Sequence, residues 1–248
     1  MVSWMATWSR PNTLAMVDAP LVVENPTGQR LCEKQVGQRF GRWKVSANTT
    51  NLGSPNLAGV HLREQLEASG WHYDDGRGGP PSSGHVLSDV YPYTTIVGAC
   101  ELGYETERPR YTSADPTACR LASSGRSELR PMTDCPPRWT AFVATIPPLD
   151  LRSHPVTAKL LQAPSPASDR EYKHREDLLD AALCAWTGLL WLQRGLDGCQ
   201  VLGLTNEAAR QATIIAPARG RTACSRGVVR DTSMTGPDQA SPLEGAQE

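Results

Sequence analysis

Four aspartates are the residues of this sequence best suited to chemistry. Asp177 and Asp180 are three residues apart in a predicted helix, so they are neighbours on its surface. Their like charges repel unless a divalent ion or bulk solvent screens them. Asp18 follows the apolar run LAMV, and Asp89 lies near the end of the run VLSDVY. Ligands gather at the carboxyl ends of parallel strands, although Asp18 could instead cap a turn.

A basic stretch over residues 29–45, QRLCEKQVGQRFGRWKV, predicts a second kind of contact. Its cations are Arg30, Lys34, Arg39, Arg42 and Lys44, set against the single acid Glu33. Phe40 and Trp43 stand among these cations, and this mixture of charge and aromatic rings suits phosphates and stacked bases. A charge run can equally be a solvated face of the protein. The stretch is therefore a candidate nucleic-acid contact.

Composition limits the class of protein. At 248 residues with 39% apolar side chains the chain can form one large domain with a core. A net charge of -1 and a pI near 6.5 argue against attachment to nucleic acid or membrane by overall charge. The seven cysteines lack the spacing of a disulfide framework or a zinc site. We expect a soluble, cytoplasmic protein with no membrane partner and no disulfide-linked partner.

The helix that carries Asp177 and Asp180 is predicted over residues 168–195. Ser168 and Glu171 have the spacing of a capping box, and Gly195 suits the turn after a helix. An apolar stripe should face the core, and it comprises Leu178, Ala182, Ala185, Leu189 and Leu192, widened by Leu179, Leu183, Trp186 and Leu190. The opposite face carries Lys173, Asp177, Asp180, Cys184 and Thr187.

Shorter elements are predicted before and after this helix. Strands are expected at residues 14–17 and 86–90, in one sheet, with Asp18 and Asp89 at the same edge. Residues 147–166 contain five prolines and read as a connector. Further helices are expected at 60–69, 94–102 and 206–210, and further strands at 201–204 and 213–216.

Three segments in this order resemble a known family. They are VDAPL around Asp18, SDVYP around Asp89 and the helical YKHREDLLDAALCAW. Together they resemble a family of predicted ribonuclease H-like nucleases, a domain of unknown function, over about residues 17–217. The segments NPTGQRLCE, NLGSPNLAGV, GCQVLG and TIIAP extend the resemblance.

The resemblance implies an α/β fold, a ribonuclease H-like mixed sheet flanked by helices. Asp18, Asp89 and Asp180, with Asp177 as an additional candidate, would bind Mg²⁺ or Mn²⁺. Two such ions about 4 Å apart can activate water and neutralise the leaving oxygen of a phosphodiester. His174 or Asp177 would carry protons, and the basic stretch would contact phosphate.

The sequence departs from the family in two places. The family's first strand, with an early Gly and Asp, should precede VDAPL, and residues 3–12 do not have that pattern. We therefore expect an N-terminally truncated domain over residues 1–217 and a disordered tail over 218–248. Asp89 stands where the family usually has Glu. A metal-dependent nuclease, a catalytically inactive module that binds nucleic acid or protein, and a partly folded fragment all remain open.

Overall fold

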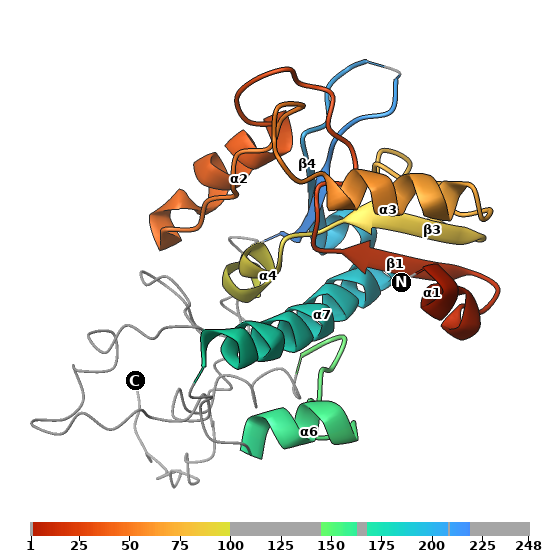
Figure 1. Ribbon diagram of the computed structural model, residues 1–248, viewed down its shortest axis with the longest axis vertical. Helices are drawn as coiled ribbons and strands as arrows, with labels where there is room; N and C mark the ends of the chain where they lie inside the picture. The colour runs from red at the N-terminus through yellow and green to blue at the C-terminus, as the bar shows by residue number, and fades with distance from the viewer. Residues whose placement is uncertain (1, 100–144, 163–167, 208, 219–248) are drawn as a thin grey trace, which may run out of the picture.

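The parallel pairing of β1 with β3 organises the chain around Asp18 and Asp89 (Figure 1). The computed structural model describes residues 2–99, 145–162, 168–207 and 209–218. Its elements in chain order are α1 (Val2–Trp8), β1 (Thr13–Val17), α2 (Leu31–Phe40), the 3-10 turn η1 (Gly41–Trp43), α3 (Ala58–Glu67), β2 (His72–Tyr73), β3 (His85–Asp89), α4 (Pro92–Gly98), α6 (Pro155–Gln162), α7 (Asp169–Arg194), the 3-10 turn η6 (Gly195–Asp197), β4 (Cys199–Leu202) and β5 (Ile214–Pro217).

The described strands form two sheets that are linked by a backbone bridge. β1, β3 and β2 lie side by side in that order, and all their pairings are parallel. β4 and β5 form an antiparallel pair, which meets the first sheet through a bridge between Val90 and Ile215. Val17 is in register with Asp89, so Asp18 and Asp89 emerge at the same edge of the sheet. The predicted α/β class, the two parallel strands and their shared edge are confirmed.

Side chains of β1 alternate between the two faces of the sheet, as a strand buried on both sides requires. Leu14 and Met16 join the cluster under α7, whereas Ala15 and Val17 join the cluster under α3. A third cluster lies between α2 and the β4–β5 pair. The strand ends, and with them the acidic residues, are thus fixed by packing from several directions.

α7 is the long helix predicted from the sequence. The Ser168 hydroxyl accepts a hydrogen bond from the Glu171 backbone N–H at 3.4 Å, and Gly195 closes the helix at φ 51°. The helix approaches β1 closely at Gly188, where an added Cβ would lie 2.6 Å from Met16 Cγ. This glycine lets the helix lie close against the sheet.

The predicted core face of α7 was wrong only in part, because Leu179, Leu183, Trp186 and Leu190 of the expected stripe are buried as predicted. Leu189 and Leu192 of the expected core stripe are 41% and 45% exposed, whereas Asp180, Cys184 and Thr187 of the expected outer face are buried. The polar face is tolerated inside because its groups find partners there: the Thr187 hydroxyl lies 2.7 Å from the Thr95 hydroxyl of α4. Asp180 therefore lies on a buried face of α7.

Other differences concern short elements. The proline-rich connector contains α6, which begins at Pro155, a residue well suited to a first helical turn. The described residues of 206–210 are not helical. β2, with two residues, and α1 were not predicted. Of the tail expected over residues 218–248, residues 219–248 lie outside the described residues.

Two further observations concern membrane-spanning helices and free cysteines. Among the helices of the described residues, none has the length and apolar character needed to span a bilayer. Cys32, Cys184 and Cys199 are buried as free thiols.

Candidate acidic site at the edge of the parallel sheet

Asp18 directly follows β1 and lies at the rim of the site. Its side chain is exposed on one side, while the neighbouring groups withdraw water from the carboxyl. This desolvation raises its pKa to about 6; Lys173 opposes the rise, and Asp177 and Glu176 add to it. Solvent on the open side screens part of these effects. Asp18 therefore shares an electrostatic environment with the first turns of α7.

Asp89 is the last residue of β3 and is buried. Its Oδ2 accepts a hydrogen bond from Arg30 Nη1 at 2.8 Å, and the Leu21 backbone N–H also donates to its carboxylate. Burial raises the pKa of Asp89 to about 7, Arg30 opposes the rise, and the charge of Asp18 adds to it.

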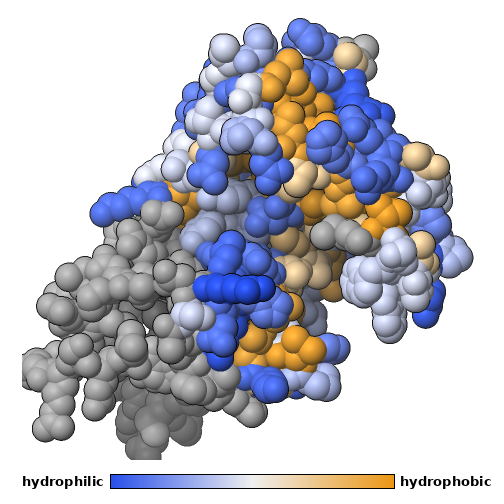
Figure 2. All heavy atoms as spheres, viewed as in Figure 1, coloured by the Kyte–Doolittle hydropathy of each residue, from blue (hydrophilic) through white to orange (hydrophobic). Residues whose placement is uncertain are grey.

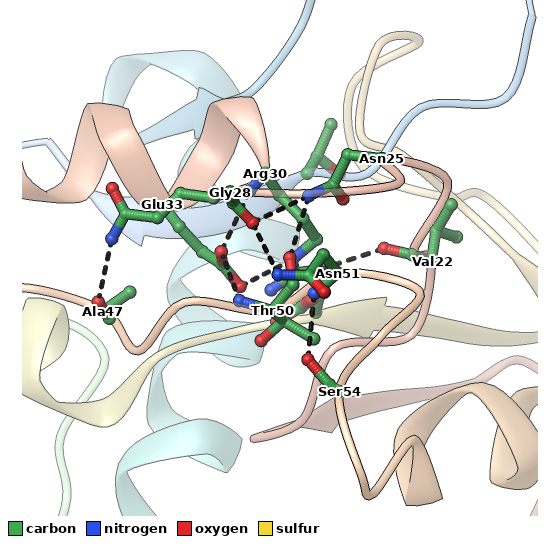
Figure 3. Close-up of polar contacts among 12 residues, drawn as sticks. Val22, Asn25, Gly28, Arg30, Glu33, Ala47, Thr50, Asn51 and Ser54 are labelled. Atoms are coloured by element: carbon green, nitrogen blue, oxygen red, sulfur yellow. Dashed lines mark hydrogen bonds and ion pairs between the residues drawn. The ribbon is translucent and has the colours of Figure 1, made fainter.

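Arg30 is buried as well, and Figure 3 shows the contacts around it. Its Nε lies 2.8 Å from Glu33 Oε1, and its Nη1 donates to the Val22 carbonyl at 3.2 Å. The other Glu33 oxygen accepts from the backbone N–H groups of Arg30 and Thr50, at 3.0 and 3.1 Å. The prediction that Arg30 contacts nucleic acid is wrong, because its guanidinium is buried and bound to Glu33, Asp89 and the Val22 carbonyl.

Two asparagines join the loops around this ion-pair network (Figure 3). The Asn25 Nδ2 donates to the carbonyls of Gly28 and Thr50, at 2.9 and 3.0 Å. The Asn51 Nδ2 donates to the same Gly28 carbonyl at 3.1 Å. The two sequence segments NPTGQRLCE and NLGSPNLAGV, separate along the chain, are thus one structural unit behind Asp89.

α7 supplies the third carboxylate. Asp180 is 7% exposed, and its pKa is raised to about 7 by burial and by the charge of Asp18. One turn later the buried thiol of Cys184 has its pKa raised by burial and by Asp18, Asp180 and Asp89 together. β1 and β3 end at the same edge and α7 packs on β1, so the three carboxylates whose charges act on this thiol lie in one part of the structure.

The start of α7 carries a second set of charges, which is more exposed. Lys173 Nζ lies 2.9 Å from Glu176 Oε2 and 3.0 Å from Asp177 Oδ1, so a lysine supplies the cation beside Asp177. Glu176 was missed in the sequence, although it stands four residues before Asp180, a spacing that puts both acids on one face. Figure 2 shows hydrophilic residues over this part of α7.

His174 does not join the carboxylates. It is exposed, and the helical repeat places it about 120° around α7 from Asp180. Its predicted role as a proton carrier at this site has no support in the geometry.

The remaining cations of the basic stretch are at the surface. Lys34, Arg39, Arg42 and Lys44 are exposed. Phe40 and Trp43 are 1% and 4% exposed, so these rings belong to the core and are not available for stacking on bases. The basic stretch retains its charges but not its predicted aromatic contacts.

Metal binding can be judged from the donors present. Carboxylate oxygens are the ligands that Mg²⁺ and Mn²⁺ prefer, and a divalent cation would offset the charge of Asp18, which raises the pKa of both Asp89 and Asp180. Within the described part of the chain, however, no three His, Cys, Asp or Glu residues are grouped closely enough to hold an ion. The donor chemistry fits such a metal, but the ligand shell is not preformed.

A separate hollow of about 360 Å³ lies at β2 and is lined by His72, Tyr73, Asp74, Asp75, Arg77 and Arg210. Its two arginines are already engaged: Arg210 pairs with Glu67 at 2.9 Å, and Arg77 donates to the Ala209 carbonyl at 3.3 Å. None of the three converging aspartates lines this hollow.

Comparison with protein-family models, with curated proteins and with solved structures finds no match to this chain.

Proposed function

We propose that this protein is a metal-dependent nuclease or a related phosphoryl-transfer enzyme that acts on nucleic acid. The observation that carries the proposal is the convergence of Asp18, Asp89 and Asp180, from two adjacent parallel strands and a long helix, on one region at the sheet edge. Carboxylates gathered in this way suit divalent metal ions that act on phosphodiesters. The ribonuclease H-like arrangement proposed from the sequence has strand-end and helix carboxylates of this kind.

Asp18 and Asp180 are the residues that we expect to hold Mg²⁺ or Mn²⁺, with Asp89 completing the site. When bound, the metal would supply Lewis-acid activation of water and neutralise charge on the phosphate. Asp89 is oriented by Arg30, and Asp177 lies at the exposed rim, where it can exchange protons with solvent. Lys173 is paired with Glu176 and Asp177, and its positive charge opposes the rise in the pKa of Asp18.

A catalytically inactive binding module is the second candidate. Arg30 already occupies Asp89 Oδ2 at 2.8 Å, and an internal cation in that position can stand in for a metal. On this alternative the acidic residues are a remnant held by an ion pair, and nucleic acid or protein binds elsewhere on the surface.

Thermal melts with added Mn²⁺ or Mg²⁺ separate the two candidates. An enzyme site should bind metal in the folded state, so its melting temperature should rise with metal concentration. Asp180→Asn should abolish the rise because it removes a buried ligand beside Asp18. Asp177→Asn is the matched control, one turn earlier and exposed, and should only weaken it. Hydrolysis of a labelled oligonucleotide should be lost in Asp180→Asn.

The possible contrary results have distinct meanings. A wild-type protein with no metal-dependent rise and no hydrolysis supports the binding module and ends the enzyme proposal. A rise that survives Asp180→Asn but not Asp177→Asn would move the metal to the exposed start of α7.

A further inference from the structure

One edge of β1 carries no strand. Among the described strands, β1 pairs only with β3, and it is the outermost strand of its sheet (Figure 1). All five residues of β1 are half-buried, whereas β3, in the middle of the sheet, is buried over its last four residues. An open strand edge is a template on which another strand can pair.

The backbone of β1 offers hydrogen bonds at this open edge. The Val17 carbonyl accepts from the Val90 N–H at 3.0 Å, on the side of β3. Successive residues of a strand direct their backbone groups to opposite sides, so Ala15 also bonds toward β3, whereas Leu14 and Met16 point outward. Among the described residues, no turn, loop or helix bonds the backbone of these two outward residues.

The edge lacks the features that normally keep an exposed strand from pairing with another chain. Its sequence, TLAMV, has no charged residue and no proline. Its register with β3 is continuous over all five residues, so no bulge twists the strand away. Charged side chains, prolines and bulges are the usual protection of an exposed edge. This edge is therefore suited to being covered by another strand.

We propose that β1 pairs in antiparallel fashion with β1 of a second copy of this chain, around a two-fold axis at Ala15. The backbone of Leu14 then exchanges hydrogen bonds with Met16 of the partner subunit, and Met16 exchanges them with Leu14 of the partner subunit. Ala15 faces its own copy at a non-hydrogen-bonded pair, where strands approach most closely, and its small side chain suits that position. An interface of this kind is closed and complementary to itself.

Charge at the two ends of β1 favours a second copy in this orientation. Arg10 lies three residues before the strand, and its N–H donates to the Thr13 hydroxyl at 2.8 Å. Its side chain is exposed, and among the described residues no acid pairs with it. Asp18 directly follows the strand and is exposed as well. Antiparallel pairing brings Arg10 of each copy to the end of the strand that carries Asp18 in the other, whereas parallel pairing would place like charges together.

The test is the mass of the full chain in solution, measured by light scattering over a dilution series in EDTA. The wild type should be a dimer that dissociates on dilution. Arg10→Glu should weaken the dimer by about tenfold, because two attractions become two repulsions. Lys34→Glu is the matched control, since Lys34 is exposed on α2 and the change in charge is the same. Adding Asp18→Arg to Arg10→Glu should restore the dimer.

A cysteine cross-link tests the register. Ala15→Cys should form a disulfide between two copies on mild oxidation, because facing residues at a non-hydrogen-bonded pair lie within disulfide distance. Thr13→Cys is the control and should not, since in this register it faces Val17 of the partner subunit. Peptide mass mapping distinguishes the new link from any that involves the native cysteines.

A wild type that stays monomeric at every concentration overturns the inference. A dimer that keeps its affinity in Arg10→Glu and gives no link at residue 15 overturns it as well, because the copies then meet at another surface. The measurements in EDTA do not depend on metal, so the dimer stands or falls separately from the proposed function.

Discussion

The guanidinium of Arg30 serves two buried carboxylates at once. Its Nε and Nη1 each lie 2.8 Å from a carboxylate oxygen, of Glu33 and of Asp89. A planar guanidinium can present donors in both directions, which the single ammonium of lysine cannot do with the same geometry. Arg30 thus joins the start of α2 to the end of β3 and fixes the orientation of Asp89.

Arg30→Met should destabilise the fold by about 3–5 kcal/mol, because Glu33 and Asp89 would remain buried without their cation. Arg39→Met is the control, since Arg39 is exposed and bonds the neutral amide of Gln200. We expect the control to lose less than about 1 kcal/mol in urea unfolding. Similar losses in the two variants would show that the buried network contributes little.

The pH dependence of the free energy of unfolding should reveal that Asp180 is protonated in the folded protein near neutral pH. Its folded pKa of about 7 lies above the ordinary aspartate pKa of 3.8, so between these pH values the folded state binds a proton that the unfolded state has released. The resulting stability is fully present below about pH 4 and is lost as pH rises to about 7, by up to about 1.4 kcal/mol per pH unit.

Urea unfolding at several pH values checks this prediction. In Asp180→Asn the free energy of unfolding should fall less between pH 4 and 7, and the remaining fall should come from Asp18 and Asp89. In Asp177→Asn the fall should be the same as in the wild type. An unchanged slope in Asp180→Asn would mean that this carboxyl is ionised throughout the window.

At the scale of elements, α3 positions the segment that carries Asp18. Gly59 lies in its first turn, where an added Cβ would lie 2.4 Å from the Pro20 carbonyl oxygen and 2.9 Å from Ala19 Cβ. These neighbours follow Asp18 directly in the chain. The helix therefore supports the rim of the acidic site through backbone contact, and a larger residue here would move that rim.

Gly59→Ala should cost about 1–3 kcal/mol through this overlap with backbone. Gly37→Ala in α2 is the matched control, because nothing lies within 4 Å of its added Cβ. Alanine there should stabilise the helix by about 0.5–1 kcal/mol. Thermal melts of both variants give the comparison, and a neutral Gly59→Ala would show that the loop after β1 yields easily.

For the whole molecule, the two sheets are joined by more than the Val90–Ile215 bridge. The buried Tyr73 hydroxyl donates to the Gln211 carbonyl at 2.9 Å and accepts from the Thr213 backbone N–H at 3.2 Å. β2 at one edge is thereby tied to the approach to β5. The two sheets and the described helices packed on them should consequently unfold as one unit.

Deletion of residues 221–248 should leave the melting temperature unchanged within error, because this segment has few apolar side chains to offset the entropy of ordering. Deletion from residue 214 is the control and should unfold the protein, since Ile214, Ile215 and Ala216 are buried. A large loss of stability on removing 221–248 would show that these residues pack on the domain.

The sequence by itself determined the features that depend on neighbours along the chain. Apolar runs that are followed by an acid and then a proline predicted β1 and β3. The capping-box spacing of Ser168 and Glu171 predicted the start of α7. The common edge of Asp18 and Asp89 followed because parallel strands present their carboxyl ends together. These inferences hold because hydrogen-bond periodicity and strand polarity are local properties.

Tertiary structure decided what those residues contact. Arg30 looked like a surface cation, but its partner Asp89 is 59 positions away, and only folding brings the two together. The polar line of Asp180, Cys184 and Thr187 looked solvated, yet it is buried against partners contributed by other elements. Burial of a polar group depends on whether a distant segment satisfies it, and periodicity carries no information about that segment.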